Sequence, residues 1–119
     1  MSLSDTAGVA SAELVRDVVR LVLDVHDGLE VGVHLLARRE DAAAKVRAAY
    51  EAGCRRFDST IGGLGTCAYV QDVMVGNLAT EVLLATLKEM GAELPELEPL
   101  EHLVAMSVEM EKRYGAAVQ

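Results

Sequence analysis

Apolar and polar positions along the chain follow two periods, and together they predict strands and helices in alternation. Three short, mostly apolar runs predict strands at 3–5, 31–36 and 56–60. Stretches with an apolar residue every three or four positions predict helices at 13–26, 42–52, 81–90 and 100–114. The strands begin about 26 to 28 residues apart, which is enough for one strand, one helix and two short loops per unit.

Local signals mark where these elements begin and end. Ser11 offers an N-cap for the first helix, and Gly28 follows its last turn. Gly53 ends the second helix, and Thr80 is predicted to cap the third. The glycine-rich stretch 61–76 is predicted to be a loop.

Repeated βα units predict an α/β fold, because consecutive strands joined by a helix run parallel with right-handed crossovers. We predict a single domain over residues 1–119, with three parallel βα units and a terminal helix at 100–114. A closed eight-stranded barrel needs roughly 250 residues, so three units correspond to part of one. Open sheet edges and one uncovered face predict a homo-oligomer or a complementing barrel chain as partner.

Composition narrows the class of protein. Aromatic residues make up 3% and Trp is absent, so the core is predicted to be aliphatic. The net charge of −8 and only two pairs of adjacent arginines, at 38–39 and 55–56, argue against a nucleic-acid partner. No apolar run reaches the ~18 residues of a membrane span. The first residues lack the pattern of a secretory signal, and the two cysteines do not form a disulfide framework. Both observations predict a cytoplasmic setting.

Candidate chemistry gathers where the predicted strands end, as is typical of α/β barrels. His34 lies in an apolar strand, either as a metal ligand or as a buried, hydrogen-bonded histidine. Strand alternation places Leu36 on the same face, where a second histidine would make a chelating pair. Cys67 on the glycine-rich loop is either an acid, base or nucleophile that acts on a substrate, or a loop thiol without a role. Asn77 is either a metal ligand or a turn residue ahead of a helix.

Two further features of the sequence have alternative interpretations. The run Gly62-Gly63-Leu64-Gly65 is compatible with phosphate binding through backbone N–H groups, or with a tight loop that needs glycine. Cys54, at the start of the third strand, is predicted to be a small buried apolar residue.

Taken together, these segments resemble one family. Residues 57–81, FDSTIGGLGTCAYVQDVMVGNLATE, are similar to the hallmark region of 3-hydroxy-3-methylglutaryl-CoA lyases. In that family a strand ending in Asp-Ser precedes a loop with Gly-Leu-Gly-Gly-Cys-Pro-Tyr or a close variant, and a Gly-Asn-(Leu or Ile)-(Ala or Pro)-Thr-Glu segment follows. Residues 4–10, SDTAGVA, and 31–38, VGVHLLAR, resemble the sixth and seventh strands of that family. The resemblance covers the chain up to about Gly91 and implies units six to eight of a TIM barrel.

The resemblance also implies an activity. Such lyases cleave 3-hydroxy-3-methylglutaryl-CoA to acetyl-CoA and acetoacetate with Mg²⁺ or Mn²⁺, which eases deprotonation of the substrate hydroxyl. His34 and Asn77 match metal ligands of the family, and Cys67 matches its catalytic cysteine. Asp5 matches an acidic residue of the sixth strand, and Glu81 matches a carboxylate for which we expect a structural role.

The sequence departs from the family pattern in three places. Leu36 stands where the family has its second histidine ligand, and Thr66 and Ala68 replace Gly and Pro beside the cysteine. The Arg-Asp motif that supplies another ligand and the catalytic arginine has no counterpart. We therefore expect a lyase fragment that is inactive alone; the alternative is a non-catalytic barrel remnant that serves as an assembly or interaction module.

Overall fold

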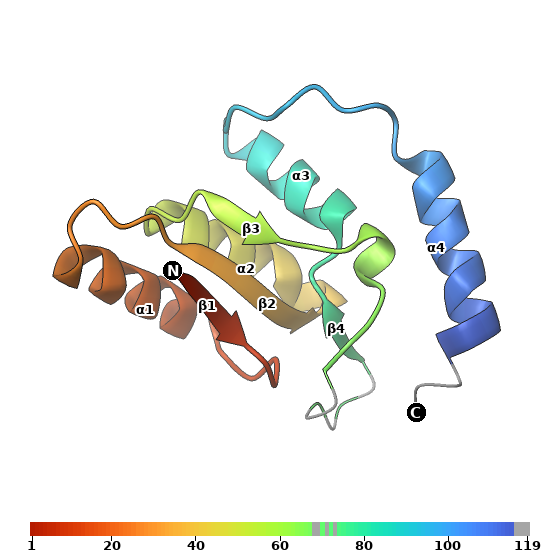
Figure 1. Cartoon of the computed structure of the whole chain (residues 1–119), viewed down its shortest axis with the longest axis horizontal. Helices are drawn as coiled ribbons and strands as arrows, with labels where there is room; N and C mark the ends of the chain where they lie inside the picture. Colours follow the sequence, from red (N-terminus) through yellow and green to blue (C-terminus); the bar gives the residue numbers. More distant parts are fainter. Residues whose placement is uncertain (68–69, 71, 73, 116–119) are drawn as a thin grey trace.

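The parallel sheet predicted from the strand spacing is present in the computed structural model, which describes residues 1–67, 70, 72 and 74–115 (Figure 1). Its parallel strands are β1 (Ser2–Asp5), β2 (Gly32–Arg38) and β3 (Arg56–Asp58), in the order β1-β2-β3. The helices that follow them in the chain are α1 (Ala12–Val25), α2 (Arg39–Glu51) and α3 (Thr80–Glu89). This arrangement confirms the α/β class with three parallel βα units.

One strand was not predicted. The stretch 61–76, expected to be only a loop, contains a 3₁₀ turn, η1 (Ile61–Gly63), and the start of a short strand, β4 (Val75–Asn77). β4 runs antiparallel to the end of β2, with Leu36 opposite Asn77. A strand of three residues with glycine at its centre has no apolar period of its own, so only its long-range pairing identifies it.

Helices α1, α2 and α3 pack against one face of the sheet and form the aliphatic core that the composition predicted. Two clusters of buried residues make up this core: Val15, Val19, Val33, Leu35, Ala49 and Cys54, and then Ala37, Ala42, Val46, Leu78, Leu83 and Leu87. Cys54 is fully buried, as predicted, and its Sγ lies 3.4 Å from the Val31 carbonyl oxygen. Burial raises the pKa of the Cys54 thiol.

Of the two predicted helix N-caps, one is confirmed and one is wrong. The Ser11 hydroxyl accepts a hydrogen bond from the Leu14 N–H at 3.1 Å and caps α1, as expected. The prediction for Thr80 is wrong, because the N-cap residue of α3 is Ala79. Thr80 is already the first helical residue, and its hydroxyl lies 2.8 Å from the Ser59 hydroxyl, tying the helix start to the end of β3.

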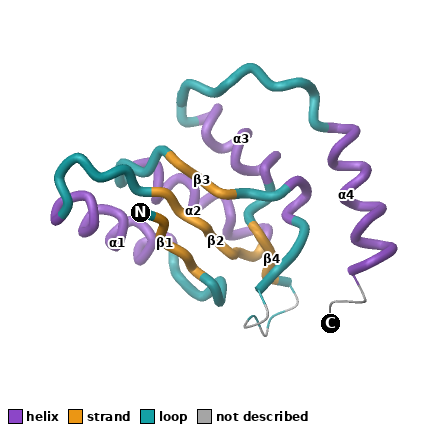
Figure 2. Tube along the Cα trace, in the orientation of Figure 1, coloured by secondary structure: helices purple, strands orange, loops and turns teal. Residues whose placement is uncertain are grey.

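The last helix, α4 (Glu101–Tyr114), lies away from the sheet and contacts η1 (Figure 2). The Ser107 hydroxyl donates to the Ile61 carbonyl oxygen at 2.8 Å, and a Cβ added at Gly62 would lie 2.6 Å from that hydroxyl oxygen. The apolar side predicted for this helix is largely exposed, including Leu103 and Val108. The contact is made by small residues, which an apolar periodicity does not reveal.

Candidate functional site

The face of the sheet opposite the core is polar at the level where the parallel strands end. Strand register places Ser4, His34 and Asp58 side by side on β1, β2 and β3. Because Val33 and Leu35 point into the core, alternation turns His34 to the opposite face. The His34 side chain is half-exposed there, and its Nδ1 lies 3.6 Å from Asp58 Oδ2. Asp58 was not singled out from the sequence, although the register of β2 and β3 pairs it with His34.

Leu36, on the same strand face as His34, is 2% exposed. Gly8 and Val75 lie close to the Leu36 side chain. A Cβ added at Gly8 would lie 3.4 Å from Leu36 Cβ and 2.4 Å from Val75 Cγ1. The β1–α1 turn and β4 therefore close over this side chain. A buried apolar residue therefore lies directly opposite Asn77 in the register of β2 and β4, two residues along β2 from His34.

Asn77 anchors the glycine-rich segment. Its backbone N–H donates to the Gly65 carbonyl oxygen at 3.0 Å, and its side-chain Nδ2 donates to the Leu64 carbonyl oxygen at 3.0 Å. A Cβ at Gly65 would lie 3.1 Å from Nδ2, and one at Gly63 would lie 2.8 Å from the Asn77 carbonyl oxygen. Both glycines also have positive φ, so close approach and backbone conformation explain their presence. Because the Asn77 Nδ2 atom is used in the hydrogen bond to Leu64, Oδ1 is the side-chain atom suited to a metal ion.

Cys67 lies on the segment between η1 and β4 and is partly buried. The Thr66 hydroxyl donates to the Val75 carbonyl oxygen at 3.1 Å, and the Val70 N–H donates to the Cys67 carbonyl oxygen at 3.0 Å. The first of these bonds attaches the cysteine segment to β4 and so to the end of β2. The departure noted at Ala68 lies outside the described residues.

An exposed ion pair joins the same segment to β2 directly. The Arg38 Nε donates to Asp72 Oδ2 at 2.9 Å, and the Met74 N–H donates to Asp72 Oδ1 at 2.9 Å. The Met74 N–H and then the Arg38 guanidinium lower the pKa of the Asp72 carboxyl group.

The two thiols should differ sharply in reactivity. We expect iodoacetamide at pH 8 to alkylate Cys67 at least about 100-fold faster than Cys54 in the folded chain, because reaction requires an accessible thiolate. Burial raises the pKa of Cys54, so its thiolate fraction is lowered at any pH below that pKa. Peptide mass spectrometry measures both rates. In denaturant the two rates should become similar, and rapid labelling of Cys54 in the folded chain would contradict the expectation.

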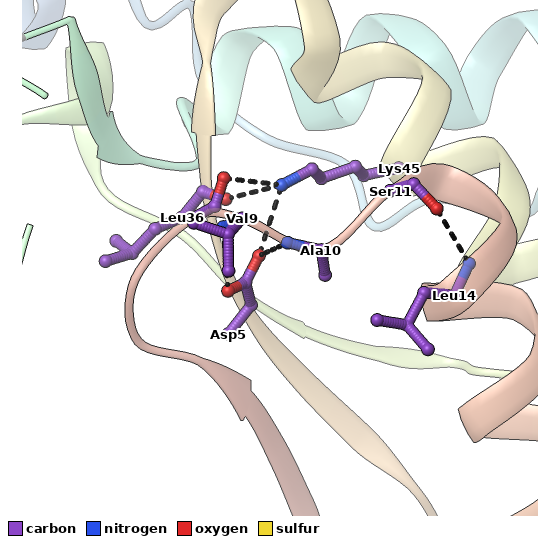
Figure 3. A network of polar contacts seen from close by, with 8 residues as sticks. Asp5, Val9, Ala10, Ser11, Leu14, Leu36 and Lys45 are labelled. Carbon is purple, nitrogen blue, oxygen red and sulfur yellow. Dashed lines mark hydrogen bonds and ion pairs between the residues drawn. The ribbon is translucent and has the colours of Figure 1, made fainter.

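The carboxylate of Asp5 is fully engaged at the end of β1 (Figure 3). Its Oδ1 accepts from the Val9 N–H at 3.2 Å, and its Oδ2 accepts from the Ala10 N–H at 3.0 Å. Lys45 Nζ donates to the same Oδ2 at 3.2 Å. These partners indicate that Asp5 shapes the turn between β1 and α1.

Lys45 completes this network from α2. Besides Asp5, its ammonium group donates to the Leu36 carbonyl oxygen at 3.0 Å and to the Gly8 carbonyl oxygen at 3.3 Å. The side chain of Lys45 is 5% exposed and that of Asp5 is 9% exposed. Sequence reasoning missed Lys45, although its spacing from Ala42, Val46 and Ala49 places it on the buried face of the helix.

Glu81 also has an identifiable contact. Its Oε2 accepts from the Gly62 N–H at 3.0 Å, which links α3 to η1. This bond supports the structural role expected for Glu81.

The described residues do not by themselves fit a divalent metal ion. No group of three or more His, Cys, Asp or Glu side chains with metal-binding geometry occurs among them. The two expected ligands, His34 and Asn77, are borne by paired strands, but the residue directly opposite Asn77 in the register is Leu36, which cannot bind a metal ion. Since Mg²⁺ requires near-octahedral coordination, two ligands leave most of the coordination shell unfilled.

The fold and the strand-end residues define a partial α/β barrel of the lyase type, and comparison with known proteins agrees. The HMGL-like family model matches residues 1–111, so the chain belongs to the HMGL-like family. No helix in the described part of the chain is long and apolar enough to cross a membrane.

Individual relatives are similar over most of this chain. The (R)-citramalyl-CoA lyase of Chloroflexus aurantiacus is 34% identical over 105 residues, covering 88% of this chain and 32% of the relative. The hydroxymethylglutaryl-CoA lyase YngG of Bacillus subtilis is 30% identical over 115 residues, covering 97% of this chain and 38% of the relative. The chain thus spans about a third of the length of the curated relatives it matches.

Solved structures show the same relationship. An HMG-CoA lyase from Acinetobacter baumannii, in complex with coenzyme A and 3-methylmalate, matches with a TM-score of 0.73 at 33% identity, covering 96% of this chain and 36% of that one. The Bacillus subtilis HMG-CoA lyase matches with a TM-score of 0.76 at 31% identity and covers 96% of this chain and 37% of that one. These matches confirm the expected family resemblance and the partial TIM-barrel fold.

Proposed function

We propose that this chain supplies the strand-end portion of a carbon–carbon lyase site that cleaves an acyl-CoA substrate of the 3-hydroxy-3-methylglutaryl type. The observation that carries the proposal is the pairing of β4 with β2. This pairing attaches the Cys67 segment, through Asn77, to the strand that presents His34 on its polar face. The family to which the chain belongs, and the coenzyme A complex of one neighbour, support the substrate class.

Each group has a defined task in this proposal. Cys67 donates the proton that the acetyl-CoA enolate takes up after the bond is cleaved, because a thiol on a substrate-facing segment is suited to proton transfer. The Asp58 carboxylate, 3.6 Å from His34 Nδ1, favours Nε2 as the imidazole atom that faces a ligand. Asp5 and Lys45 hold the ends of β1 and β2 in place.

We propose Mg²⁺ or Mn²⁺ as the cofactor of the complete site, with His34 and Asn77 as the contribution of this chain. The other ligands then come from outside residues 1–119, which is consistent with the fraction of each relative that the chain covers. The 119 residues alone are expected to be inactive. A cytoplasmic setting and a homo-oligomer or complementing barrel chain belong to the same proposal.

The test is acetoacetate formation from 3-hydroxy-3-methylglutaryl-CoA with Mn²⁺, measured with a coupled dehydrogenase assay. The chain alone should give no product, whereas a stoichiometric complex with the portion of YngG outside the matched segment should form acetoacetate. Cys67→Ser should reduce that rate at least about 100-fold, in the range that general acid catalysis contributes. Cys54→Ala, a change at the buried thiol, is the matched control.

A second function, that of a non-catalytic assembly module, is favoured by one observation. Leu36 is buried at a ligand position and cannot coordinate a metal ion. A complex with the YngG portion that forms stably yet yields no acetoacetate would support this function over catalysis.

A further inference from the structure

The guanidinium group of Arg55 is held in a fixed position at the start of β3, the strand that ends at Asp58. Its Nη1 donates to the Tyr50 carbonyl oxygen at 2.7 Å and to the Cys54 carbonyl oxygen at 2.8 Å. Its central carbon lies 4.0 Å from the centroid of the Tyr50 ring, which is a cation–π contact. These three contacts fix the head of the side chain, although Arg55 is exposed to solvent.

The same contacts leave one edge of the guanidinium group available. Nη1 carries two N–H groups, and both are used by the two carbonyl oxygens. Nε and Nη2, which form the other edge, have no hydrogen-bond or salt-bridge partner in the described part of the chain. Two parallel N–H groups of this kind match the two oxygens of a carboxylate. Because the group is already oriented, little conformational entropy is lost when an anion binds to it.

Arg55 also lines a cavity of about 550 Å³. We call it the Arg55 cavity, and its volume is within the range of roughly 300–1,000 Å³ that is typical of small-molecule sites. Figure 1 shows its setting, because α3 ends close to the start of β3. Apart from Arg55 the wall is largely apolar and includes six residues of β3, α3 and the segment that follows α3: Phe57, Leu83, Leu84, Leu87, Ala92 and Leu94.

We propose that the Arg55 cavity binds a monocarboxylic acid with an apolar chain of medium length. The carboxylate pairs with Nε and Nη2 of Arg55, and the chain lies against the leucine side chains of α3. The charged hydrogen bonds fix the head group. Removal of the chain from water supplies the remaining affinity, in proportion to the apolar area that is buried.

Charge around the cavity favours a carboxylate over a phosphate ester. A phosphate monoester carries about 1.5 to 2 negative charges at pH 7. Among the described residues that line the cavity, Arg55 is the only cation, and Glu93 adds a negative charge. A single negative charge is therefore matched by Arg55, whereas a second one would be repelled by Glu93.

The cavity is separate from the lyase site of the proposed function. Arg55 precedes β3, whereas His34 and Asp58 meet where the parallel strands end. A ligand in the cavity therefore does not compete with an acyl-CoA substrate. It contacts both β3 and α3, and since it binds the folded chain it should raise the midpoint of thermal unfolding.

Isothermal titration of the whole chain with octanoate, without a metal ion, tests the proposal. One octanoate should bind per chain. Acetate lacks the apolar chain and 1-octanol lacks the carboxylate, so each should bind at least about tenfold more weakly than octanoate. Octyl phosphate should also bind more weakly than octanoate, because of its additional charge.

Variants at two adjacent arginines locate the site. Arg55→Met should weaken octanoate binding at least about tenfold, because the charged hydrogen bonds are lost. Arg55→Lys retains the charge but not the paired N–H groups, so it should also weaken binding. Arg56→Met is the matched control and should bind normally, because Arg56 donates to the Met1 carbonyl oxygen and does not line the cavity. Leu84→Asp, at a partly buried position of the apolar wall, should weaken binding without removing Arg55.

Circular dichroism of each variant confirms that it is folded before binding is compared. The proposal is overturned by an absence of saturable octanoate binding or by equal losses in Arg55→Met and Arg56→Met. Equal affinity for octanoate and 1-octanol would also overturn it, since the carboxylate would then have no partner. Tighter binding of octyl phosphate would contradict the predicted head group. Neither Mn²⁺ nor acyl-CoA is present in the titration, so these outcomes are independent of the proposed lyase function.

Discussion

Replacing Lys45 with methionine should lower the free energy of unfolding by about 3 to 5 kcal/mol, the range for removing one member of a buried ion pair. The substitution leaves the Asp5 carboxylate buried without a charged partner. It also leaves the Leu36 and Gly8 carbonyl oxygens without the ammonium donor that they share. Since a domain is stable by only about 5 to 15 kcal/mol, this loss is a large share of the total.

Urea unfolding followed by circular dichroism measures the change. Arg47→Met is the matched control on the same helix, because Arg47 pairs with Glu89 at the surface, where both side chains are at least 44% exposed. An exposed pair of this kind contributes about 0 to 1 kcal/mol. If the two substitutions change the stability equally, the network at the strand ends is not the stabilising feature that its burial indicates.

Lys45 also illustrates which features of the fold cannot be predicted from the sequence. The strand and helix pattern could be predicted because apolar periodicity is a local property of the chain. The spacing of Lys45 places it on the buried face of α2, but its role depends on carbonyl groups at Gly8 and Leu36, which distant segments bring to it. Long-range contacts of this kind are not encoded in any single window of sequence.

Candidate site residues could be proposed from the sequence to a similarly limited extent. His34, Asn77 and Cys67 follow from residue type and position near strand ends, together with the family resemblance. The placement of Asn77 close to the strand that bears His34 depends on β4. The pairing of β4 with β2 could not be predicted, because β4 is only three residues long and contains a glycine. The neighbour of His34, Asp58, follows from the register of β2 and β3, which the sequence alone does not fix.

Leu36→His should strengthen Mn²⁺ binding at least about tenfold, a gain of about 1.4 kcal/mol. The new imidazole would lie two residues from His34 on the same strand face and opposite Asn77 in the register. Three candidate ligands would then come from two paired strands. The substitution also buries a polar ring at a site that is 2% exposed, so we expect it to cost about 1 to 3 kcal/mol of stability.

The electron paramagnetic resonance signal of free Mn²⁺, titrated with protein, measures this affinity. Leu21→His, at an exposed position on α1, adds one histidine away from the site and should leave the affinity unchanged. Adding His34→Ala to Leu36→His should remove the gain, because the chelating pair is lost. A gain that survives His34→Ala, or that Leu21→His reproduces, would mean that the strand-end face of β2 is not a latent metal site. The buried leucine would then be a packing residue that belongs to this fold, and not the change that separates this chain from a metal-binding lyase.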